Sequence, residues 1–507
     1  MTRVKQNAIG ADIKRQFATT QDAIDARGIK VGDVIQIAER ADATFEAKTG
    51  LTPNGYNIIA GQGAINFVLR ESSKIYLAQW GLDNSNSAAV NTSILQAFAD
   101  YASLNRVEGV LPKQNGIAFN GPITFTSPSF DWTYQLAGYG LKFTELVNQS
   151  TGGEHGFVLT GSSGTESVWS EFKRFLITGN ASSGDGFHVE FAGRVEFDRV
   201  ECSDHGGSGF HYENSWSPSF IRCRGDRNGE YGVFCLGGVN NDTNGAYVEG
   251  GAYSSNTLDG IYIEAASDDD TLSGEIFNVG LSNNLRNGIW IKTPGLTVMG
   301  CFPEFNQGAQ IKIGDSADAR VIVGVVISQS YFDARNLSGP DHQGVVIEEA
   351  RGVSIDACNF KNVISCVEID AASTNITIGT TALNRRTTAT TTNIADINST
   401  LVTDATKPLH IRQEVVQVGI GSINKYQVES GTTGYRFDIE GNGATASSSL
   451  ARILKDGAVL AGMRNDGRLI LDGAISTAGS PTTIQNKIEI FDAAGASLGW
   501  VPIYANF

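Results

Sequence analysis

The sequence predicts an all-β protein whose middle part is a parallel β-helix, a solenoid in which each coil adds short strands to long parallel sheets. Three observations support this prediction. A glycine-anchored strand recurs along residues 150–375, a second column of residues recurs in the same register, and glycine is abundant without a collagen-like period. The 59 glycines in 507 residues exceed the about 7% of an average protein, and only 11 prolines accompany them.

The recurring unit is a glycine followed by an alternating apolar strand. Its clear copies start 30, 23, 23, 28 and 28 residues apart. Units of about 20–30 residues with short strands and no helix are typical of parallel β-solenoids. Weaker copies begin at Gly308, Gly344 and Cys366. The clear copies are Gly156-Phe157-Val158-Leu159, Gly186-Phe187-His188-Val189, Gly209-Phe210-His211-Tyr212, Gly232-Val233-Phe234-Cys235, Gly260-Ile261-Tyr262-Ile263 and Gly288-Ile289-Trp290-Ile291.

A second column of residues follows the same shifts. Phe197 falls on Phe220, and the next two coils place Val248 and Ile276 there. Asparagine recurs in a further column, and asparagine tolerates left-handed turns and hydrogen-bonds to nearby backbone. We therefore expect a stacked asparagine ladder made by Asn228, Asn256 and Asn284.

Outside the repeat, the chain is expected to hold two further parts. Residues 1–75 are predicted to form a small N-terminal connector, with helical spacing over residues 7–26 and 32–48. Residues 76–400 are assigned to the β-helix, and residues 401–507 to a C-terminal antiparallel β domain for trimerisation, carbohydrate contact or both. Hairpin turns such as Asn-Gly and Asp-Gly punctuate this last part.

The β-helix is expected to open with a short helix. Apolar residues at Ile94, Leu95, Phe98 and Tyr101 lie on one helical face. Strands should follow from Glu108 onward, because the pattern then alternates between apolar and polar residues.

Composition excludes several classes of function. The formal net charge of −16 argues against nucleic acid and anionic lipid as partners, and no run of apolar residues is long enough to cross a membrane. The N-terminus has no apolar signal region. Six cysteines lack the spacing of a zinc or redox site, so buried thiols and a reducing cytoplasm during assembly are expected. No cofactor is expected, and no residue is assigned to a metal.

Strand alternation turns the repeat into a surface map, because successive side chains point to opposite faces. If the residue after each glycine points inward, the next residue points outward. An exposed aromatic column of this kind suits sugar stacking, or it is covered by loops or a neighbouring subunit; both interpretations stay open. The outward column is His188, His211, Phe234, Tyr262 and Trp290, and a second one is Glu190, Glu213, Leu236, Glu264 and Lys292.

The carboxylates of the second column have the spacing of a glycosidase. Adjacent coils lie about 4.8 Å apart, so Glu190 and Glu213 suit the about 5–5.5 Å of a retaining enzyme. Glu213 and Glu264, two coils apart, approach the about 6.5–9.5 Å of an inverting enzyme. An aromatic neighbour such as Tyr262 or Trp290 would raise the pKa of a general acid by desolvation. The alternative is that each glutamate is a solvated surface residue.

The longer coils add loops that could wall a groove. These loops hold Asn240-Asn241-Asp242 and Ser267-Asp268-Asp269-Asp270. The three aspartates could supply an acid, bind calcium or simply be solvated. Trp216, on a neighbouring loop, is a candidate sugar platform, while Asp226 and Glu249 are reserve acids expected on a different face from Glu213.

One known family shares the entry motif of the predicted β-helix. Trp80-Gly81-x-Asp83-Asn84, the helix after Asn91-Thr92, and Gly109-x-Leu111-Pro112 with Leu136-x-Gly138-x-Gly140 resemble the pectate-lyase-like right-handed β-helix superfamily. This opening is common in bacteriophage tailspikes, although the usual Gly-Asp-Gly is degraded to Gly81-Leu82-Asp83. The segment Lys487–Tyr504 is similar to the C-terminal tail of many capsule-depolymerising tailspikes.

The resemblance implies a homotrimeric phage tailspike of the virion that is assembled in the host cytoplasm. It would attach to the phage tail or baseplate through its N-terminus, without nucleic acid or membrane insertion, and bind a bacterial surface polysaccharide. The predicted reaction is endo-hydrolysis by Glu213 with Glu264 or Glu190. His188, His211, Tyr262, Trp290 and Trp216 are expected to hold sugars. A β-eliminating polysaccharide lyase, disfavoured by the lack of a Lys/Arg cluster, and a non-catalytic adhesin remain as alternatives.

Overall fold

The computed structural model divides the chain into two compact units, Met1–Val416 and Gln417–Phe507. In the first unit the structure describes residues 15–27, 29–30, 33–38, 43–49, 53, 58–61, 65–69, 74–127, 133–161, 167–237, 245–265, 274–318, 320–334, 343–361, 363, 365–370, 372–378 and 382–384. In the second unit it describes the seven strands between residues 425 and 502. The expected boundaries after residues 75 and 400 stay predictions.

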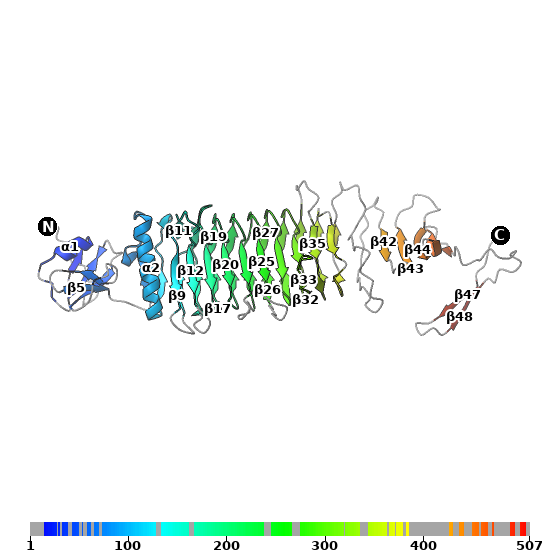
Figure 1. Cartoon of the computed structure of the whole chain (residues 1–507), viewed down its shortest axis with the longest axis horizontal. Coiled ribbons are helices and arrows are strands. Elements are labelled where there is room, and N and C mark those ends of the chain that lie inside the picture. The colour runs from blue at the N-terminus through cyan, green and yellow to red at the C-terminus, as the bar shows by residue number, and fades with distance from the viewer. Residues whose placement is uncertain are drawn as a thin grey trace. The chain divides into compact units, whose positions relative to one another are not determined.

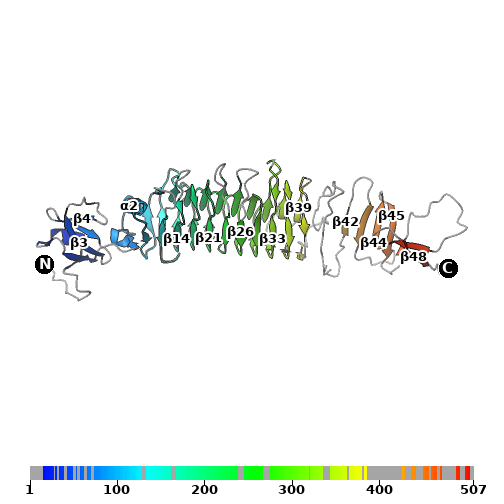
Figure 2. The same cartoon turned by 90° about the horizontal axis from the view of Figure 1, so that it is seen from below.

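Most of the first unit is a parallel β-helix, as predicted (Figure 1). Successive coils feed strands into three sheets, which we call sheets I, II and III. Sheet I, seen side by side in Figure 2, contains β6 (Lys74–Tyr76), β7 (Glu108–Val110), β10 (Gln135–Ala137), β14 (Glu171–Lys173), β18 (Glu196–Asp198), β21 (Ser219–Ile221), β24 (Tyr247–Glu249), β26 (Gly274–Phe277), β29 (Leu296–Met299), β33 (Val326–Ser328), β37 (Ser354–Asp356) and β40 (Thr377–Ile378).

Sheet II comprises two five-stranded segments, and sheet III is continuous. Sheet II contains β8 (Ile117–Phe119), β11 (Glu145–Asn148), β15 (Leu176–Thr178), β19 (Glu201–Ser203) and β22 (Arg224–Asp226), then β27 (Gly280–Ser282), β30 (Phe302–Glu304), β34 (Tyr331–Asp333), β38 (Asn359–Lys361) and β41 (Ala382–Asn384). Sheet III contains β9 (Ile123–Thr126), β12 (Phe157–Thr160), β16 (Phe187–Glu190), β20 (Phe210–Glu213), β23 (Val233–Leu236), β25 (Ile261–Glu264), β28 (Ile289–Lys292), β31 (Ile311–Ile313), β35 (Gln343–Ile347) and β39 (Ser365–Ile369).

The glycine that precedes strands β12, β16, β20, β23, β25 and β28 of sheet III is required by close approach of the next coil. A Cβ built on Gly232 would lie 2.6 Å from the carbonyl oxygen of Gly260, and one on Gly186 would lie 2.7 Å from that of Gly209. The sequence alignment of the weak copy, which places Gly308 at the position of the anchoring glycine, is wrong by two residues. Ile311 pairs with Ile289, so Gln310 rather than Gly308 stands at the glycine position.

Inward side chains stack from coil to coil and form the core. Phe187 and Phe210 are nearly parallel with ring centroids 6.0 Å apart, and Phe197 and Phe220 are parallel at 5.3 Å. Phe220 pairs onward with Val248, which confirms the second repeat column. All six cysteines are buried, and burial raises the pKa of Cys223 and of Cys235 to about 12.

The asparagine ladder is confirmed and is longer than expected. The backbone N–H and the side-chain amide of Asn228 both donate to Asn256 Oδ1, at 3.0 and 3.1 Å. Asn256 bonds to Asn284 in the same way, and Asn284 to Asn306. The ladder ends where the Asn306 amide donates to Gln310 Oε1 at 2.8 Å.

A helix covers the N-terminal end of the β-helix (Figure 1). This helix, α2 (Ala88–Asn105), follows the short 3-10 helix η2 (Leu77–Trp80) and begins at Ser87, whose side chain accepts the Val90 N–H. Ile94, Leu95 and Phe98 are buried against the first coils, as predicted. No helix among the described residues is long and apolar enough to cross a membrane.

The N-terminal part differs from its prediction. Residues 32–48 were expected to be helical, but they contain β2 (Val34–Ile37) and most of β3 (Ala43–Thr49), because Val34, Ile35 and Ile37 are buried and favour strands. Only α1 (Thr20–Asp25) of residues 7–26 is helical, and residues 7–14 lie outside the described residues. The remaining strands of this sheet are β1 (Arg15–Phe17), β4 (Ile58–Ala60) and β5 (Ile65–Leu69).

The second unit contains antiparallel strands, which fits the hairpin turns of its sequence. One sheet has the order β42-β43-β44-β45-β46, and β47 pairs with β48. Its strands are β42 (Lys425–Val428), β43 (Tyr435–Glu440), β44 (Ser449–Lys455), β45 (Ala458–Arg464), β46 (Leu469–Ile470), β47 (Lys487–Phe491) and β48 (Ser497–Pro502).

Candidate functional site

The predicted outward columns exist on sheet III. His188 pairs with His211, which pairs with Phe234, and Tyr262 and Trp290 follow in register. Each ring contacts the next along the column, with centroids 4.5 Å apart for the two histidines and 5.3 Å apart for the stacked Phe234 and Tyr262. The same register aligns Glu190 with Glu213 and Glu264 with Lys292.

The C-terminal end of this ring column, Tyr262 and Trp290, is not open to solvent as a sugar platform would be. Tyr262 is only 6% exposed, packed between Phe234, Trp290 and Tyr231, and its hydroxyl donates to Glu264. Tyr262 therefore offers no free ring face, contrary to the expectation. Trp290 is partly buried and donates its indole N–H to the Gly314 carbonyl at 2.8 Å.

Glu264 is held in a charged network rather than poised as an acid. Lys292 Nζ lies 3.1 Å from Glu264 Oε1, and Arg320 binds both Glu264 and Asp318. Burial raises the pKa of Glu264, but hydrogen bonds from Tyr262, Arg320 and Lys292 outweigh this effect and lower it. The expectation of a raised pKa beside Tyr262 is wrong for this residue.

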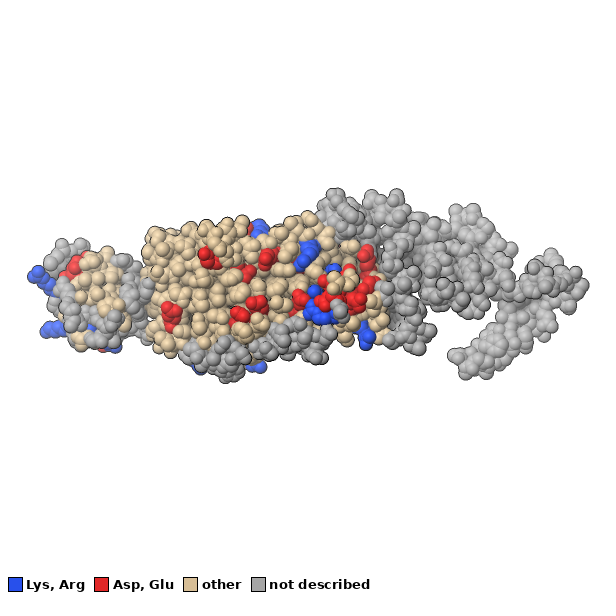
Figure 3. Space-filling model, in the orientation of Figure 1, with Lys and Arg blue, Asp and Glu red and all other residues tan. Residues whose placement is uncertain are grey.

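The sequence also suggested that cations do not cluster, and the structure corrects this. Three cationic groups lie over the Trp290 ring, with Arg286 at 4.5 Å, Lys312 at 4.8 Å and Lys292 at 5.6 Å from its centroid. Carboxylates neutralise them, since Arg286 binds Asp259 and Lys312 lies 3.2 Å from Glu348. Figure 3 shows basic and acidic side chains intermingled in one patch toward the C-terminal end of the viewed face.

At the N-terminal end of the column, strands β16 and β20 bring carboxylates and histidines together. One donor atom from each of His188, Glu190 and Glu213 lies within 4.8 Å of the others. His211 Nε2 is 3.4 Å from Glu213 Oε2, an ion-pair contact without regular hydrogen-bond geometry, and His188 Nε2 is 3.8 Å from Glu213 Oε1. Asn214 donates to Glu190 at 3.4 Å.

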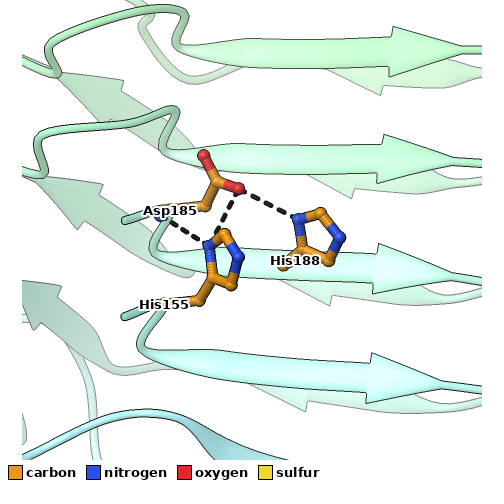
Figure 4. Close-up of side chains that lie close together, drawn as sticks. All are labelled: His155, Asp185 and His188. Atoms are coloured by element: carbon orange, nitrogen blue, oxygen red, sulfur yellow. Dashed lines mark hydrogen bonds and ion pairs between the residues drawn. The ribbon is translucent and has the colours of Figure 1, made fainter. Parts of the chain in front are cut away.

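A buried aspartate, missed in the sequence, anchors these histidines. Asp185 Oδ2 lies 3.1, 3.0 and 3.2 Å from the Nδ1 atoms of His155, His188 and His211, which come from three successive coils. Figure 4 shows His155 and His188 converging on this oxygen. Asp185 Oδ1 accepts the Ser208 N–H at 2.7 Å, which fixes the carboxylate.

A third column in the repeat would have revealed Asp185. His155, Asp185, Ser208, Tyr231, Asp259 and Asn287 each stand immediately before an anchoring glycine. These residues lie in the turn that enters sheet III, so the alternation inside the strands does not include them. From this column Asp185 contacts His188 and His211 of the outward column.

The charges of the cluster depend on one another. Burial raises the pKa of Asp185, but hydrogen bonds from His188 and His211 and the charge of His211 outweigh it and lower the pKa far below its usual range. Burial lowers the pKa of His211, but Asp185 and Glu213 outweigh burial and raise it to about 9. The pKa of Glu213 is lowered, chiefly by His211. His211 is thus a cation and Glu213 an anion at neutral pH.

Two groups in this cluster have donor atoms of the kind that bind metal ions. They are His155 with Asp185 and His188, and His188 with Glu190 and Glu213. In the first group the Asp185 N–H donates to His155 Nδ1 at 3.0 Å, which engages the lone pair that a metal would need. We therefore treat the group as hydrogen-bonded histidines and a carboxylate, and assign no metal to it.

The other predicted site residues lie elsewhere. Trp216 follows sheet III at the turn into sheet I, where Arg194 rather than a ring of the column is its neighbour. Asp226 lies on sheet II, paired with Arg224, and Glu249 lies on sheet I. Both are on different sheets from Glu213, as expected. Residues 240–242 and 267–270 lie outside the described residues.

Comparison with known proteins identifies the fold but no sequence family. No family model and no curated protein match the chain. The enzymatically active domain of tailspike protein 2 of bacteriophage CBA120 is 12% identical, with coverage of 86% of this chain and 67% of that one and a TM-score of 0.50.

Two other viral structures are similar over most of the chain. ORF18 of Geobacillus virus E2 is 13% identical over 97% of this chain and 100% of that one, with a TM-score of 0.48. The tailspike gp49 of Acinetobacter baumannii bacteriophage Fri1, a capsular polysaccharide depolymerase, is 12% identical over 84% and 81%, with a TM-score of 0.41. At such identities the similarity concerns architecture alone, and the match to tailspike protein 2 shows that the two chains share the parallel β-helix fold.

Proposed function

We propose that this protein is a phage tailspike that binds a bacterial surface polysaccharide and depolymerises it by endo-hydrolysis. The observation that carries the proposal is the pair of outward carboxylates, Glu190 and Glu213, on adjacent strands of sheet III beside two histidines. The phage tailspikes among similar structures support it at the level of fold.

The two carboxylates have distinct roles in this proposal. His211 keeps Glu213 ionised, so Glu213 is the nucleophile that attacks the anomeric carbon. Glu190 gives its proton to the glycosidic oxygen as that bond breaks, and the leaving sugar departs with the proton. Glu190 then deprotonates a water, which releases the sugar from Glu213. A carboxylate oxygen of Glu190 lies within 4.8 Å of one of Glu213. This separation fits the retaining route better than the wider separation of the two carboxylates in inverting enzymes.

The sugars would lie along the part of the ring column that solvent reaches. His188 and His211 are partly exposed and remain in the proposed binding surface, whereas the Trp290 ring is occupied by Arg286 and Lys312. Glu264 is left out as catalytic partner because Lys292 and Arg320 neutralise it.

Substitution of Glu213 tests the proposed site. Glu213→Gln removes the nucleophile while keeping the side-chain size, so we expect depolymerisation to fall by at least about 10²-fold. Glu275→Gln, an exposed glutamate on β26, is the matched control and should retain full activity. The measurement is the loss of chain length of purified capsular polysaccharides and O-antigens. Full activity of Glu213→Gln would overturn the assignment, and binding without shortening by the wild type would indicate an adhesin.

A β-eliminating lyase is a second candidate because of the histidine cluster. Elimination from an acidic sugar needs a cation against its carboxylate and a base near the ring. The His211 cation and the neighbouring His188 offer both. The product distinguishes the reactions, since a lyase leaves an unsaturated end that absorbs ultraviolet light and a hydrolase does not.

We further propose that the protein is a homotrimer of the virion, attached to the phage tail through its N-terminal part. Support comes from the tailspike fold and from exposed apolar side chains on the β-helix. Val321, Val323 and Val326 are 45%, 44% and 38% exposed within six residues of sequence, an apolar surface that a neighbouring chain would cover.

A further inference from the structure

A cavity lies around the corner from the proposed catalytic pair. It has a volume of about 350 Å³, at the lower end of the range of small-molecule sites. It lies at the start of three neighbouring strands of sheet I, because Glu171 begins β14, Glu196 begins β18 and Ser219 begins β21. Its lining is Trp169, Glu171, Arg194, Glu196, Ser217 and Ser219.

The aromatic wall of this cavity is exposed and holds a cation. Trp169 is 56% exposed, and the Arg194 guanidinium lies 4.4 Å from its ring centroid and 5.4 Å from that of Trp216. Among the described residues no carboxylate forms an ion pair with Arg194. Two indoles therefore hold the guanidinium in place, and its N–H groups are left for another acceptor.

The acidic wall is charge-balanced. Glu171 and Glu196 are opposite each other on β14 and β18, and Lys173 lies 2.9 Å from the first carboxylate and 3.3 Å from the second. With Arg194, the two positive and two negative charges cancel. A strongly charged ligand gains nothing from such a site, whereas a ligand with many hydroxyls finds donors and acceptors around it.

The backbone beneath the cavity is rigid. Strand β13 (Ser167–Val168) pairs with β17 (Ala192–Gly193), and Gly193 pairs with Trp216 in turn. A Cβ on Gly193 would lie 2.3 Å from Trp216 Cε2, so the indole packs directly on this glycine. The buried Tyr212 hydroxyl donates to the Ala192 and Trp216 carbonyls at 2.9 and 3.0 Å. The platform is therefore preformed, which lowers the cost of binding.

We propose that this cavity binds one uncharged pyranose residue of the polysaccharide, away from the bond that is cleaved. The C–H face of the sugar packs on the exposed face of Trp169, because the C–H hydrogens carry a partial positive charge and the indole face is negative. The hydroxyls donate to Glu171 and Glu196 and accept from Arg194. This inference rests on the proposed function for the identity of the polymer.

One polysaccharide chain can reach both the cavity and the carboxylate pair of Glu190 and Glu213. Arg194 follows Glu190 by four residues, so their Cα atoms are at most about 14 Å apart. The cavity would hold the polysaccharide while the bond at Glu190 and Glu213 is cleaved. Its contribution is to affinity for the polymer.

The affinity for polysaccharide tests the cavity separately from catalysis. The parent is the Glu213→Gln protein, and the probe is the capsular polysaccharide or O-antigen that the wild type binds most tightly in a purified panel. We expect Trp169→Ala in this parent to raise the Kd about tenfold, and Trp169→Phe to restore most of the affinity. Arg194→Gln should also raise it severalfold. Phe143→Ala is the matched control, because Phe143 is 50% exposed under the Lys113 ammonium, 4.6 Å from its ring centroid, and should leave the Kd unchanged.

The outcomes separate this inference from the proposed function. If Trp169→Ala and Arg194→Gln both bind as tightly as the parent, the cavity proposal is overturned and the proposed function is unaffected. If the wild type binds a polysaccharide but never shortens it, the proposed function is overturned, and the same affinities still decide the cavity proposal. If no polysaccharide in the panel binds, both are overturned. Unchanged melting temperatures of the variants show that they are folded.

Discussion

At the residue scale, His211 links the buried and the exposed halves of the candidate site. Its Nδ1 is 3.2 Å from the buried Asp185 carboxylate, and its Nε2 is 3.4 Å from Glu213. Asp185 holds the imidazole as a cation, and the cation in turn keeps Glu213 ionised. The chemistry of Glu213 therefore depends on an aspartate that solvent scarcely reaches.

This charge arrangement predicts a pH-dependent contribution of His211 to stability. Its pKa is about 9 in the folded protein and about 6.5 when unfolded. The folded state binds the proton more tightly, so the stabilisation is complete below about pH 6.5 and is lost as the pH rises through 9. The melting temperature of the wild type should exceed that of His211→Gln most at pH 6, and the gap should shrink by pH 9.5.

His205 provides a control of opposite sign. Burial lowers its pKa to about 4, so it binds a proton less readily when folded, and stability rises as the pH increases from 4 to about 6.5. The melting-temperature gap between the wild type and His205→Gln should therefore widen over that range. A gap for His211→Gln that does not change between pH 6 and 9.5 would contradict the proposed charge state.

At the scale of the element, the coil is defined by its backbone contact with the next coil. The anchoring glycine is needed because the carbonyl of the following coil occupies the place of a side chain. This explains why the glycine recurs even though loops of different length separate the strands.

Two glycine substitutions should therefore differ in effect. The Cβ of Gly232→Ala would lie 2.6 Å from the Gly260 carbonyl oxygen, so the coils must separate, and we expect a loss of about 1–3 kcal/mol in stability. At Gly280 on β27 the nearest atom to a Cβ is 3.6 Å away, so Gly280→Ala should be tolerated. The first thermal unfolding transition measures both, and equal effects would show that close approach is not the reason for the glycine column.

The elements that sequence could predict are those defined by periodicity. Alternation placed His211 and Glu213 on one face correctly, because the repeat aligns strands residue by residue. It could not show that Tyr262 is buried, since the residues that cover it, Tyr231 and Arg286, come from turns rather than strands. The same limit explains why Asp185 was missed. Helical spacing failed at residues 34–37, where burial of β-branched side chains decided for a strand.

At the scale of the whole molecule, each described strand of the β-helix sheets pairs only with strands of the adjacent coils. Such an architecture leaves long outer faces, and some of its apolar side chains are exposed, as at Val323. Association of three chains would cover these faces. The fold itself was predictable from the repeat, whereas the association of chains depends on surfaces that periodicity does not describe.

The proposed trimer predicts the mass in solution. Light scattering should give three times the 54.0 kDa of one chain. Val323→Asp places a charge in the exposed valine group and should reduce the trimer fraction, while Glu275→Gln should not. A wild-type mass equal to a single chain at micromolar concentration would contradict the proposal.

The buried cysteines have a consequence for the covalent structure of the folded β-helix. Only the thiolate is readily oxidised or forms disulfides, and burial keeps Cys202, Cys223, Cys235, Cys301 and Cys358 as thiols by raising their pKa. The solenoid core thus shields them from both oxidants and partner thiols. These five cysteines of the folded β-helix should therefore stay reduced in oxidising as well as in reducing surroundings.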